Sequence, residues 1–364
     1  MRALIVDDQR EFFESIRPTL KKAGFVPEYA PDMPSAQRNL TERNFDLVLT
    51  DLQMPPGNWG GLDIIKMVRQ LDVVVPLFVV SGKGSLAECI QARRLGADDY
   101  IQKEVFATEF VELVQPRFAH PYAIEHFPSL IAYLFRLFEE EQQEQAKAKR
   151  LLDVYETTMR LLSLMIMAEQ FPKAESPVPS LLKEWKMQKP SLGHYESFVF
   201  DSINGKWDGS LLNALRASDF AHRRQDCSSL THCRNQISHS TLISQHRAAE
   251  IVRDFSKVLI CLLNAVSCLR RFRLFLALTL ENHGTSWAAN GKLLQGSNLH
   301  HPTATMVLKD PPLTRHVTII TDTAVIADVG VLIEVVMSQK GDWDVYKVYN
   351  KLDENGIVFE LIPN

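Results

Sequence analysis

The chain has 364 residues, of which 46% are hydrophobic, and its 44 acidic and 40 basic side chains leave a net charge of −4 at pH 7. This length predicts two or three domains with enough apolar residues for a buried core in each. The charge argues against a protein that is strongly basic overall and binds nucleic acid, although a local basic patch stays open.

Cysteine content and hydropathy predict a cytoplasmic protein without a membrane span. The five cysteines are sparse and odd in number, which fits reduced thiols better than a disulfide framework. No signal peptide precedes the first apolar run, which starts at Ala3. The longest apolar stretch within a predicted helix, residues 161–168, is too short to cross a bilayer.

In the first third of the chain, four apolar runs each end at a polar side chain. They read as buried strands, and the segments between them are long enough for crossover helices. In an open parallel sheet the ligand site lies beyond the carboxyl ends of the strands, so one rim would collect these side chains. The polar residues that end or follow the runs are Asp7 with Asp8, Asp51, Ser81 and Lys103.

This ordered set, together with the run GADDYIQK, resembles the receiver domain of bacterial two-component response regulators over residues 1–118. The resemblance implies a doubly wound (βα)5 α/β domain. A carboxylate such as Asp51 can attack a phosphoryl group and form an aspartyl phosphate. Lys103 would pair with the phosphoryl oxygens as a point charge, and Ser81 would donate its hydroxyl to them. The phosphate would come from a sensor histidine kinase or a phosphotransfer protein.

The same resemblance implies a magnesium site and a conformational switch. Mg²⁺ prefers oxygen ligands, including one or two carboxylates. Asp8 and Asp51 would be the metal carboxylates, Asp7 would act through a water, and the Gln53 carbonyl would add a ligand. Tyr100 matches the aromatic switch residue of the family, and the alternative is an ordinary half-buried tyrosine on an edge strand.

One loop departs from the family pattern. The run from Pro55 to Gly61 is about two residues longer than usual and carries Trp59. An enlarged loop above the phosphorylation site would alter the dephosphorylation rate or the choice of partner.

The remainder is predicted as a connector with a helical linker (119–146), an all-α helical bundle (147–296) and a small C-terminal β-rich unit (297–364). Residues 135–171 contain no Gly or Pro, which predicts one continuous helix. The spacing of Leu152, Tyr155, Met159, Leu162 and Ile166 indicates a face that packs into the core. Shorter helices are predicted at 195–202 and 210–217, and a long one at 245–280.

Within the helical part, Arg234, Asn235 and His239 form an Arg-Asn-x3-His motif, predicted to lie between two helices. With the surrounding helices it resembles the HEPN family over residues 147–280. Many members are metal-independent ribonucleases whose motifs meet across a homodimer. Arg234 would stabilise charge on the scissile phosphate, Asn235 would orient it, and His239 would act as general acid or base.

Alternatives to this reading stay open. Arg216 with His222 repeats the bare pattern, and Arg234 with His239 could serve a catalytically inactive scaffold. A zinc site is a weaker option because the candidate ligands lack paired C-x2-C spacing; they are Cys227, His232, Cys233 and His239. Two basic clusters could contact RNA or simply face solvent; they are Arg223 with Arg224, and Arg270 with Arg271 and Arg273.

Together these observations predict a cytoplasmic bacterial response regulator that passes the state of Asp51 to its output part. That part is either a phosphorylation-gated ribonuclease acting on RNA or a non-enzymatic protein-interaction module.

Overall fold

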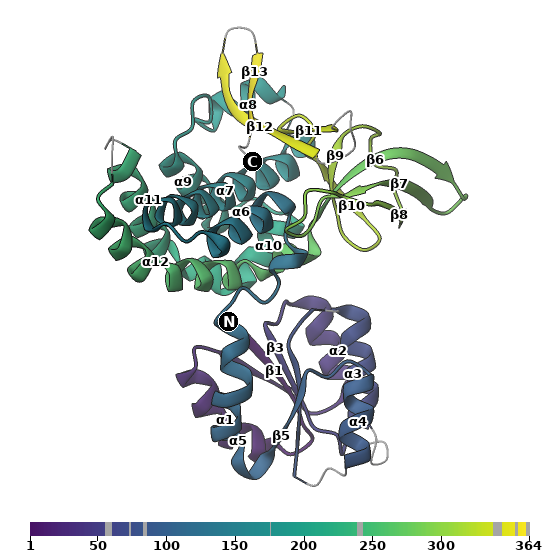
Figure 1. Cartoon of the computed structure of the whole chain (residues 1–364). Coiled ribbons are helices and arrows are strands. Elements are labelled where there is room, and N and C mark those ends of the chain that lie inside the picture. Colours follow the sequence, from purple (N-terminus) through teal and green to yellow (C-terminus); the bar gives the residue numbers. More distant parts are fainter. Residues whose placement is uncertain are drawn as a thin grey trace. The chain divides into compact units, whose positions relative to one another are not determined.

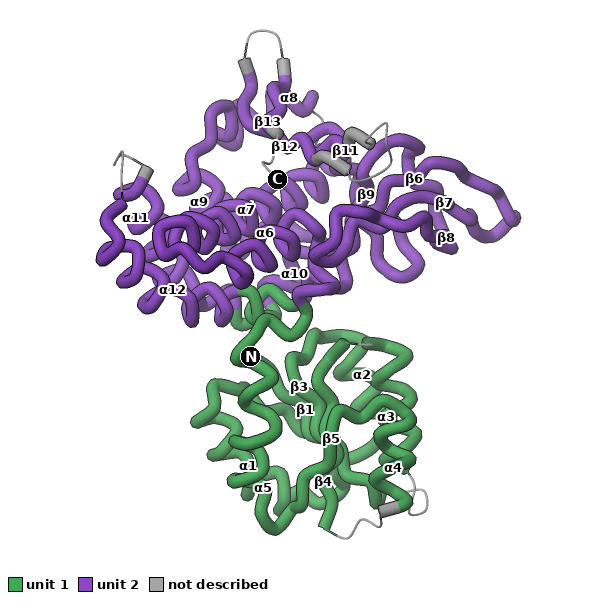
Figure 2. Tube along the Cα trace, viewed as in Figure 1, with its two compact units in different colours: residues 1–123, 217–219, 263–267 green, residues 124–216, 220–262, 268–364 purple. Residues whose placement is uncertain are grey.

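The computed structural model describes residues 1–54, 60–72, 74–82, 86–174, 176–238, 243–337, 344–353 and 356–361. Trp59 and most of its enlarged loop therefore lie outside the described residues. The chain divides into two compact units, coloured separately in Figure 2. Unit 1 comprises residues 1–123 with the short segments 217–219 and 263–267, and unit 2 comprises the rest.

Unit 1 is a doubly wound α/β domain, as predicted (Figure 1). Its five strands are all parallel and lie in the order β2-β1-β3-β4-β5. The strands are β1 (Arg2–Val6), β2 (Val26–Ala30), β3 (Leu47–Thr50), β4 (Leu77–Ser81) and β5 (Asp99–Gln102). The helices are α1 (Arg10–Lys22), α2 (Met33–Glu42), α3 (Gly60–Leu71), α4 (Leu86–Arg94) and α5 (Phe106–Glu109), and α5 continues as helical turns to Phe118.

The strands β1, β3 and β4 are buried and mostly apolar because helices cover both faces of the sheet. Successive side chains of a strand point to opposite faces. Leu4 and Val6 of β1 therefore pack in one core with residues of α2, α3 and α4, whereas Ala3 and Ile5 pack in another with residues of α1 and α5. Two separate cores thus hold the strand ends, and the polar residues that follow them, in fixed positions.

The short segment 263–267 of unit 1 is anchored at Asp46, a buried residue just before β3. One carboxylate oxygen of Asp46 accepts hydrogen bonds from the hydroxyls of Ser267 (2.7 Å) and Tyr122 (3.1 Å). The other accepts the backbone N–H of Arg2 at 2.7 Å. Asp46 thereby satisfies donors from three distant parts of the sequence within unit 1.

Unit 2 begins with a set of helices around α7, whose predicted apolar face is confirmed as buried. None of the helices among the described residues is long and apolar enough to cross a membrane. The helices are α6 (Ser129–Glu140), α7 (Glu144–Gln170), α8 (Val178–Glu184), α9 (Leu192–Asn204), α10 (Ser210–Ala217), α11 (Arg224–Ser238) and α12 (Gln245–Ala265). The two shorter helices predicted at 195–202 and 210–217 are confirmed as α9 and α10.

Three predictions about these helices are wrong. The continuous helix over 135–171 breaks before α7, because the Glu141 carboxylate accepts the backbone N–H groups of Gln142 and Gln143, both at 3.0 Å. Arg234 and Asn235 lie within α11, not between helices. The helix predicted at 245–280 ends at Ala265, and a strand follows it from Arg273.

The strand that replaces the predicted helix is β6, at the centre of a five-stranded antiparallel sheet. Pairing with β7 and β9 on its two sides outweighs the helix propensity of its Leu and Ala residues. Antiparallel strands therefore start well before Gly296, and the last three form a separate sheet. The strands are β6 (Arg273–Asn282), β7 (Trp287–Leu293), β8 (Thr303–Leu308), β9 (Val317–Ile320), β10 (Val325–Asp328), β11 (Ile333–Met337), β12 (Asp344–Asp353) and β13 (Gly356–Leu361).

A buried arginine of α7 ties the three-stranded sheet to the helices. The Arg160 guanidinium donates to the Tyr349 carbonyl (3.0 Å from Nε) and to the Val348 carbonyl (3.2 Å) of β12. A third nitrogen pairs with Glu360 of β13 at 3.1 Å. A single side chain thus contacts two strands.

We expect Arg160→Met to destabilise the protein by about 3 kcal/mol, because it leaves buried carbonyl groups without donors. Urea unfolding followed by circular dichroism would measure the loss. Arg253→Met is the control, since Arg253 is 71% exposed and pairs with its exposed neighbour Asp254. Equal stability of the two variants would show that the contacts of Arg160 with β12 and β13 do not stabilise the protein.

Candidate functional site

The carboxyl ends of four neighbouring strands bring the predicted polar residues together on one rim of unit 1. Asp7 follows β1, Asp51 follows β3, Ser81 ends β4 and Lys103 follows β5. Asp7, Asp51 and Ser81 are nearly inaccessible, with exposed fractions of 1%, 4% and 1%, whereas Asp8 is exposed. Burial of two carboxylates in one place is costly unless they are paired.

Lys103 supplies that pairing. Its Nζ lies 2.7 Å from Oδ2 of Asp7 and 2.7 Å from Oδ2 of Asp51. The same ammonium lies 4.7 Å from the centre of the Phe12 ring, a cation–π distance. Burial works against the charged ammonium, but the pairs with Asp51 and Asp7 outweigh it and raise the pKa of Lys103. Lys103 therefore stays protonated between the two acids.

The second oxygen of each acid is held by the turn that follows its strand. Oδ1 of Asp7 accepts the backbone N–H of Gln9 at 2.8 Å, and Oδ1 of Asp51 accepts that of Gln53 at 3.2 Å. Both carboxylates are thus fixed at two points, by Lys103 and by their own turn. The Gln53 backbone contacts Asp51 through its N–H, and the role of its carbonyl as a metal ligand stays a prediction.

Ser81 and Tyr100 are directly connected. The Tyr100 hydroxyl donates a 3.0 Å hydrogen bond to the Ser81 carbonyl, and the Tyr100 ring packs against the core shared with α2, α3 and α4. By contrast, the buried Ser81 hydroxyl has no hydrogen-bond partner among the described residues. A buried hydroxyl without a partner is uncommon and indicates a site for a further group.

The rim also has the donor set of a hard cation site. One oxygen each from Asp7, Asp8 and Asp51 lie within 4.8 Å of one another. Clustered carboxylate oxygens match the ligand preference of Mg²⁺. The residues present therefore fit the metal that the receiver resemblance implies.

The charge of Asp7 carries a cost in stability. Burial raises its pKa above the ordinary 3.8, although Lys103 and the Gln9 N–H oppose the rise. A folded-state pKa above the unfolded one means that stability is fully present below the unfolded pKa and is lost as pH rises through the folded pKa. We therefore expect Asp7→Asn to raise the thermal unfolding midpoint at neutral pH.

The gain from Asp7→Asn should shrink towards zero as the pH falls to about 4, near the ordinary pKa of an aspartate. Differential scanning calorimetry of both proteins across this range would measure it. A variant less stable than the parent at neutral pH would show that the Lys103 pair outweighs the burial cost.

Gly61 is a residue of this site whose role the sequence analysis did not identify. It is the second residue of α3, and a Cβ there would lie 2.1 Å from the Asp51 carbonyl oxygen and 2.5 Å from Cα of Leu52. Only glycine lets α3 pack this closely against the backbone of Asp51. A glycine two residues into a helix, where it lowers helix propensity, was the available signal.

In unit 2, the predicted motif is only partly described. The Arg234 guanidinium forms a two-point pair with Glu156 of α7, at 2.7 Å and 3.0 Å, and Asn235 is exposed. His239 lies outside the described residues. Arg234 is therefore neutralised by a carboxylate, where a phosphate-binding role needs its charge.

Some of the other candidates in unit 2 are unsuited to the roles predicted for them. Burial raises the pKa of the Cys227 thiol to about 12, which opposes the thiolate form that zinc requires. Arg216 donates to four backbone carbonyls around the end of α9. Arg270 is buried, and Arg273 pairs with Asp322 at 2.8 Å, so this cluster is not an open basic patch.

Comparison with known proteins identifies the N-terminal part. Residues 3–115 match the response regulator receiver domain family, so unit 1 contains a response regulator receiver domain, as predicted. Over 113 residues the chain is 34% identical to the response regulator protein PilR of Pseudomonas aeruginosa, covering 31% of this chain and 25% of PilR. It is 32% identical over 114 residues to the transcriptional regulatory protein PrrA of Mycobacterium leprae, covering 31% of this chain and 48% of PrrA.

A solved structure is similar over the same share of the chain. The CheY-like response regulator receiver domain protein of Methanospirillum hungatei JF-1 is 26% identical and covers 32% of this chain and 91% of that one, with a TM-score of 0.30. The chain thus spans a quarter to a half of the curated relatives named above.

Proposed function

We propose that the protein is a response regulator that accepts a phosphoryl group on Asp51 from a histidine kinase or phosphotransfer protein. The observation that carries this is the group formed by Asp51, Ser81 and Lys103 on one rim. The buried Asp51 pairs with the half-buried Lys103, and the buried Ser81 hydroxyl lacks a partner among the described residues. A nucleophile, a cation and a hydroxyl donor on one rim match the needs of phosphoryl transfer.

In the proposed step an Asp51 carboxylate oxygen attacks phosphorus. A new O–P bond forms, and the bond from phosphorus to the donor breaks, with its electron pair leaving on the donor atom. Lys103 lies next to the site of the new negative charge, and the Ser81 hydroxyl would donate to a phosphoryl oxygen. Asp7 and Asp8, with Asp51 and the Gln53 carbonyl, would hold Mg²⁺, which when bound supplies charge neutralisation at the phosphoryl oxygens.

The switch would run through Ser81 and Tyr100. A hydrogen bond between the Ser81 hydroxyl and a phosphoryl oxygen would pull on the end of β4, where Tyr100 contacts the Ser81 carbonyl.

Apolar side chains lie exposed on the elements that flank β5: Ile90 of α4 at 44%, Val105 at 42% and Val111 at 51%. We assign this surface to docking between two copies of the receiver, with a phosphorylation-dependent population of the dimer.

For unit 2 the Arg234–Glu156 pair favours a non-enzymatic protein-interaction module as the output. The second candidate is a HEPN-like ribonuclease with Arg234, Asn235 and His239 meeting across the homodimer. It is retained because Arg234, Asn235 and His239 keep the Arg-Asn-x3-His spacing and Asn235 and Gln236 of α11 are exposed. In that case Glu156 would have to release Arg234 when RNA binds.

The receiver proposal is tested by incubating the protein with acetyl phosphate, with Mg²⁺ or with EDTA, and measuring its intact mass. We expect one added phosphoryl group with Mg²⁺ and none with EDTA. Phosphorylation at the same rate in both would rule out the metal role, and no phosphorylation in either would rule out the proposal.

The two outputs are separated by a cleavage assay on total cellular RNA with both phosphorylation states and with His239→Ala. The interaction module predicts no cleavage by any form, together with a set of captured proteins that changes in Asp51→Asn. Cleavage that is lost in His239→Ala would establish the ribonuclease instead.

A further inference from the structure

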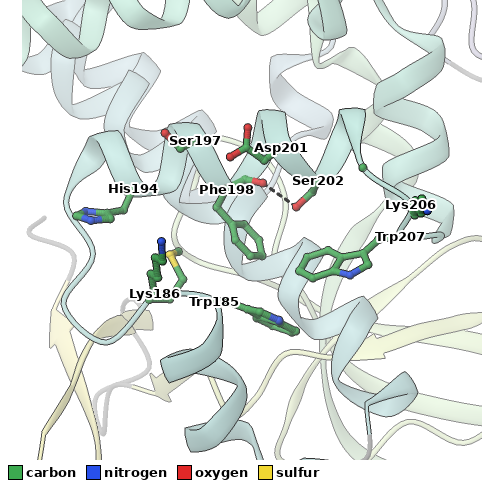
Figure 3. A pocket seen from close by; sticks show the side chains of 11 residues that line it. Trp185, Lys186, His194, Ser197, Phe198, Asp201, Ser202, Lys206 and Trp207 are labelled. Atoms are coloured by element: carbon green, nitrogen blue, oxygen red, sulfur yellow. Dashed lines mark hydrogen bonds between the residues drawn. The ribbon is translucent and has the colours of Figure 1, made fainter.

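A pocket of about 520 Å³ lies in unit 2 between the end of α8 and helix α9 (Figure 3). It is remote in sequence from the receiver rim and from the Arg234 motif, and neither role uses it. Aromatic rings line it together with basic and acidic side chains. Its volume lies within the usual range for small-molecule sites, which combine apolar walls with a few polar groups.

Three aromatic rings, Trp185, Phe198 and Trp207, form the apolar wall. Their centroids lie 5.0–5.8 Å apart in every pair. Phe171 stacks on Trp185 at 5.6 Å with an angle of 2° between the planes, which fixes the Trp185 ring. Figure 3 shows Phe198 reaching from α9 towards Trp185, with Trp207 beside it. Such an array offers flat, preorganised surfaces on which a planar ring can stack.

Arg216 of α10 forms hydrogen bonds with the backbone of the loop that carries Trp207. Its Nη2 donates to the Trp207 carbonyl at 2.6 Å and to the Gly205 carbonyl at 3.0 Å. Its Nε donates to the Ile203 carbonyl at 2.7 Å. One set of hydrogen bonds from Arg216 therefore positions the chain between α9 and Trp207, so the pocket is built into the fold.

Lys186 occupies a backbone conformation that favours glycine. Its φ is +58°, and its N–H bonds to the Lys183 carbonyl where α8 ends. Glycine is the usual residue at such a helix end, because a Cβ is strained there. A lysine kept in this conformation at the wall of a pocket indicates that its side chain is needed.

His194 adds an imidazole. Its Nδ1 lies 3.1 Å from the backbone N–H of Ser191 and 2.8 Å from the Ser191 hydroxyl, which fixes the ring at the start of α9. Lys206 lines the pocket on the side of Trp207, away from His194 and Lys186 (Figure 3). Asp201 contributes a carboxylate on α9, which lies 3.4 Å from Arg224.

From this arrangement we infer that the pocket binds a free nucleoside monophosphate. The base would stack within the aromatic wall, the phosphate would meet Lys186, and Asp201 would accept hydrogen bonds from the sugar hydroxyls. Aromatic walls also bind quaternary ammonium ions. The two lysines would repel such a cation, so the charge favours an anion. This inference is independent of the function proposed for Asp51.

Isothermal titration of the full chain with AMP and with GMP tests the inference. Adenosine and ribose 5-phosphate test whether base and phosphate are both needed, and choline tests the cation alternative. A five-residue oligoadenylate tests whether the ligand is a nucleotide within RNA. We expect saturable binding of AMP or GMP, with affinity at least about tenfold higher than that of either fragment.

The decisive variant is Lys186→Gly, because it removes the charge while relieving the backbone strain. We expect an unfolding midpoint equal to or above that of the parent and an affinity at least about tenfold lower. Lys189→Gln, an exposed lysine that does not line the pocket, is the control and should bind as the parent does. Absent or unsaturable binding of both nucleotides would overturn the inference. So would equal binding in Lys186→Gly, or stronger binding of choline or of the oligonucleotide.

Discussion

Asp51→Asn is expected to abolish phosphorylation by acetyl phosphate completely. The amide keeps the shape of the side chain and its place beside Lys103, but it lacks the anionic oxygen that attacks phosphorus. The fold should remain intact, because the variant relieves the crowding of two buried carboxylates on one ammonium. Intact-protein mass spectrometry after incubation with acetyl phosphate and Mg²⁺ measures the loss.

The matched control is Asp63→Asn. Asp63 is an exposed carboxylate on the neighbouring helix α3, where it pairs with Lys66 at 2.9 Å. It should become phosphorylated at the rate of the parent protein. If Asp51→Asn still accepted phosphate while Asp63→Asn did not, the acceptor would have been assigned to the wrong carboxylate.

Gly61→Ala is the second change with a large expected effect. The added methyl group would lie 2.1 Å from the Asp51 carbonyl oxygen, a backbone atom that cannot move without displacing the phosphoacceptor. We expect a loss of about 1–3 kcal/mol in stability and a much slower phosphorylation. Chemical unfolding and the acetyl phosphate assay would measure the two effects on the same sample.

Gly193→Ala is the control for this change. Gly193 is also the second residue of a helix, α9, but the nearest atom to its added Cβ lies at 3.9 Å. There alanine should leave stability unchanged or raise it by about 0.5–1 kcal/mol, since alanine is the better helix former. Similar losses in both variants would show that helix position, not the contact with Asp51, is responsible.

The residues of the receiver rim could be predicted because each one is identified by the strand that it ends or follows. The strands β1, β3 and β4 are short apolar runs, and polar residues stand at the carboxyl ends of β1, β3, β4 and β5, so parallel topology brings Asp7, Asp51 and Lys103 together. The pattern could not predict which partners each of these side chains contacts. The Lys103 pairs, the unpartnered Ser81 hydroxyl and the Tyr100 contact depend on distances that no spacing in the sequence encodes.

Outside the receiver, the predictions failed where the structure depends on contacts between residues that are far apart in the sequence. Residues 273–282 have the composition of a helix, yet they form the central strand of a sheet because partners lie on both sides. The pairing of Arg234 with Glu156 joins residues 78 positions apart. The aromatic wall likewise depends on how the end of α8 packs against α9, and this packing cannot be predicted from the spacing of residues in the sequence.

The raised pKa of Asp7 fits a site that gives up stability for chemistry. A neutral side chain at this position would suit the folded protein better at neutral pH, but it would remove one of the carboxylates proposed to hold Mg²⁺. The Asp7→Asn variant should therefore gain stability while phosphorylation slows. These opposite changes would separate a functional role of the charge from a structural one.

The most direct test of the proposed function is to locate the phosphoryl group itself. The phosphorylated protein would be reduced with borohydride, which converts an aspartyl phosphate into homoserine, and then digested and sequenced by tandem mass spectrometry. We predict homoserine at position 51 alone, in an amount that follows the extent of phosphorylation. Homoserine at Asp7 or Asp8, or none in a protein that has gained phosphate, would contradict the assignment of Asp51 as the phosphoacceptor.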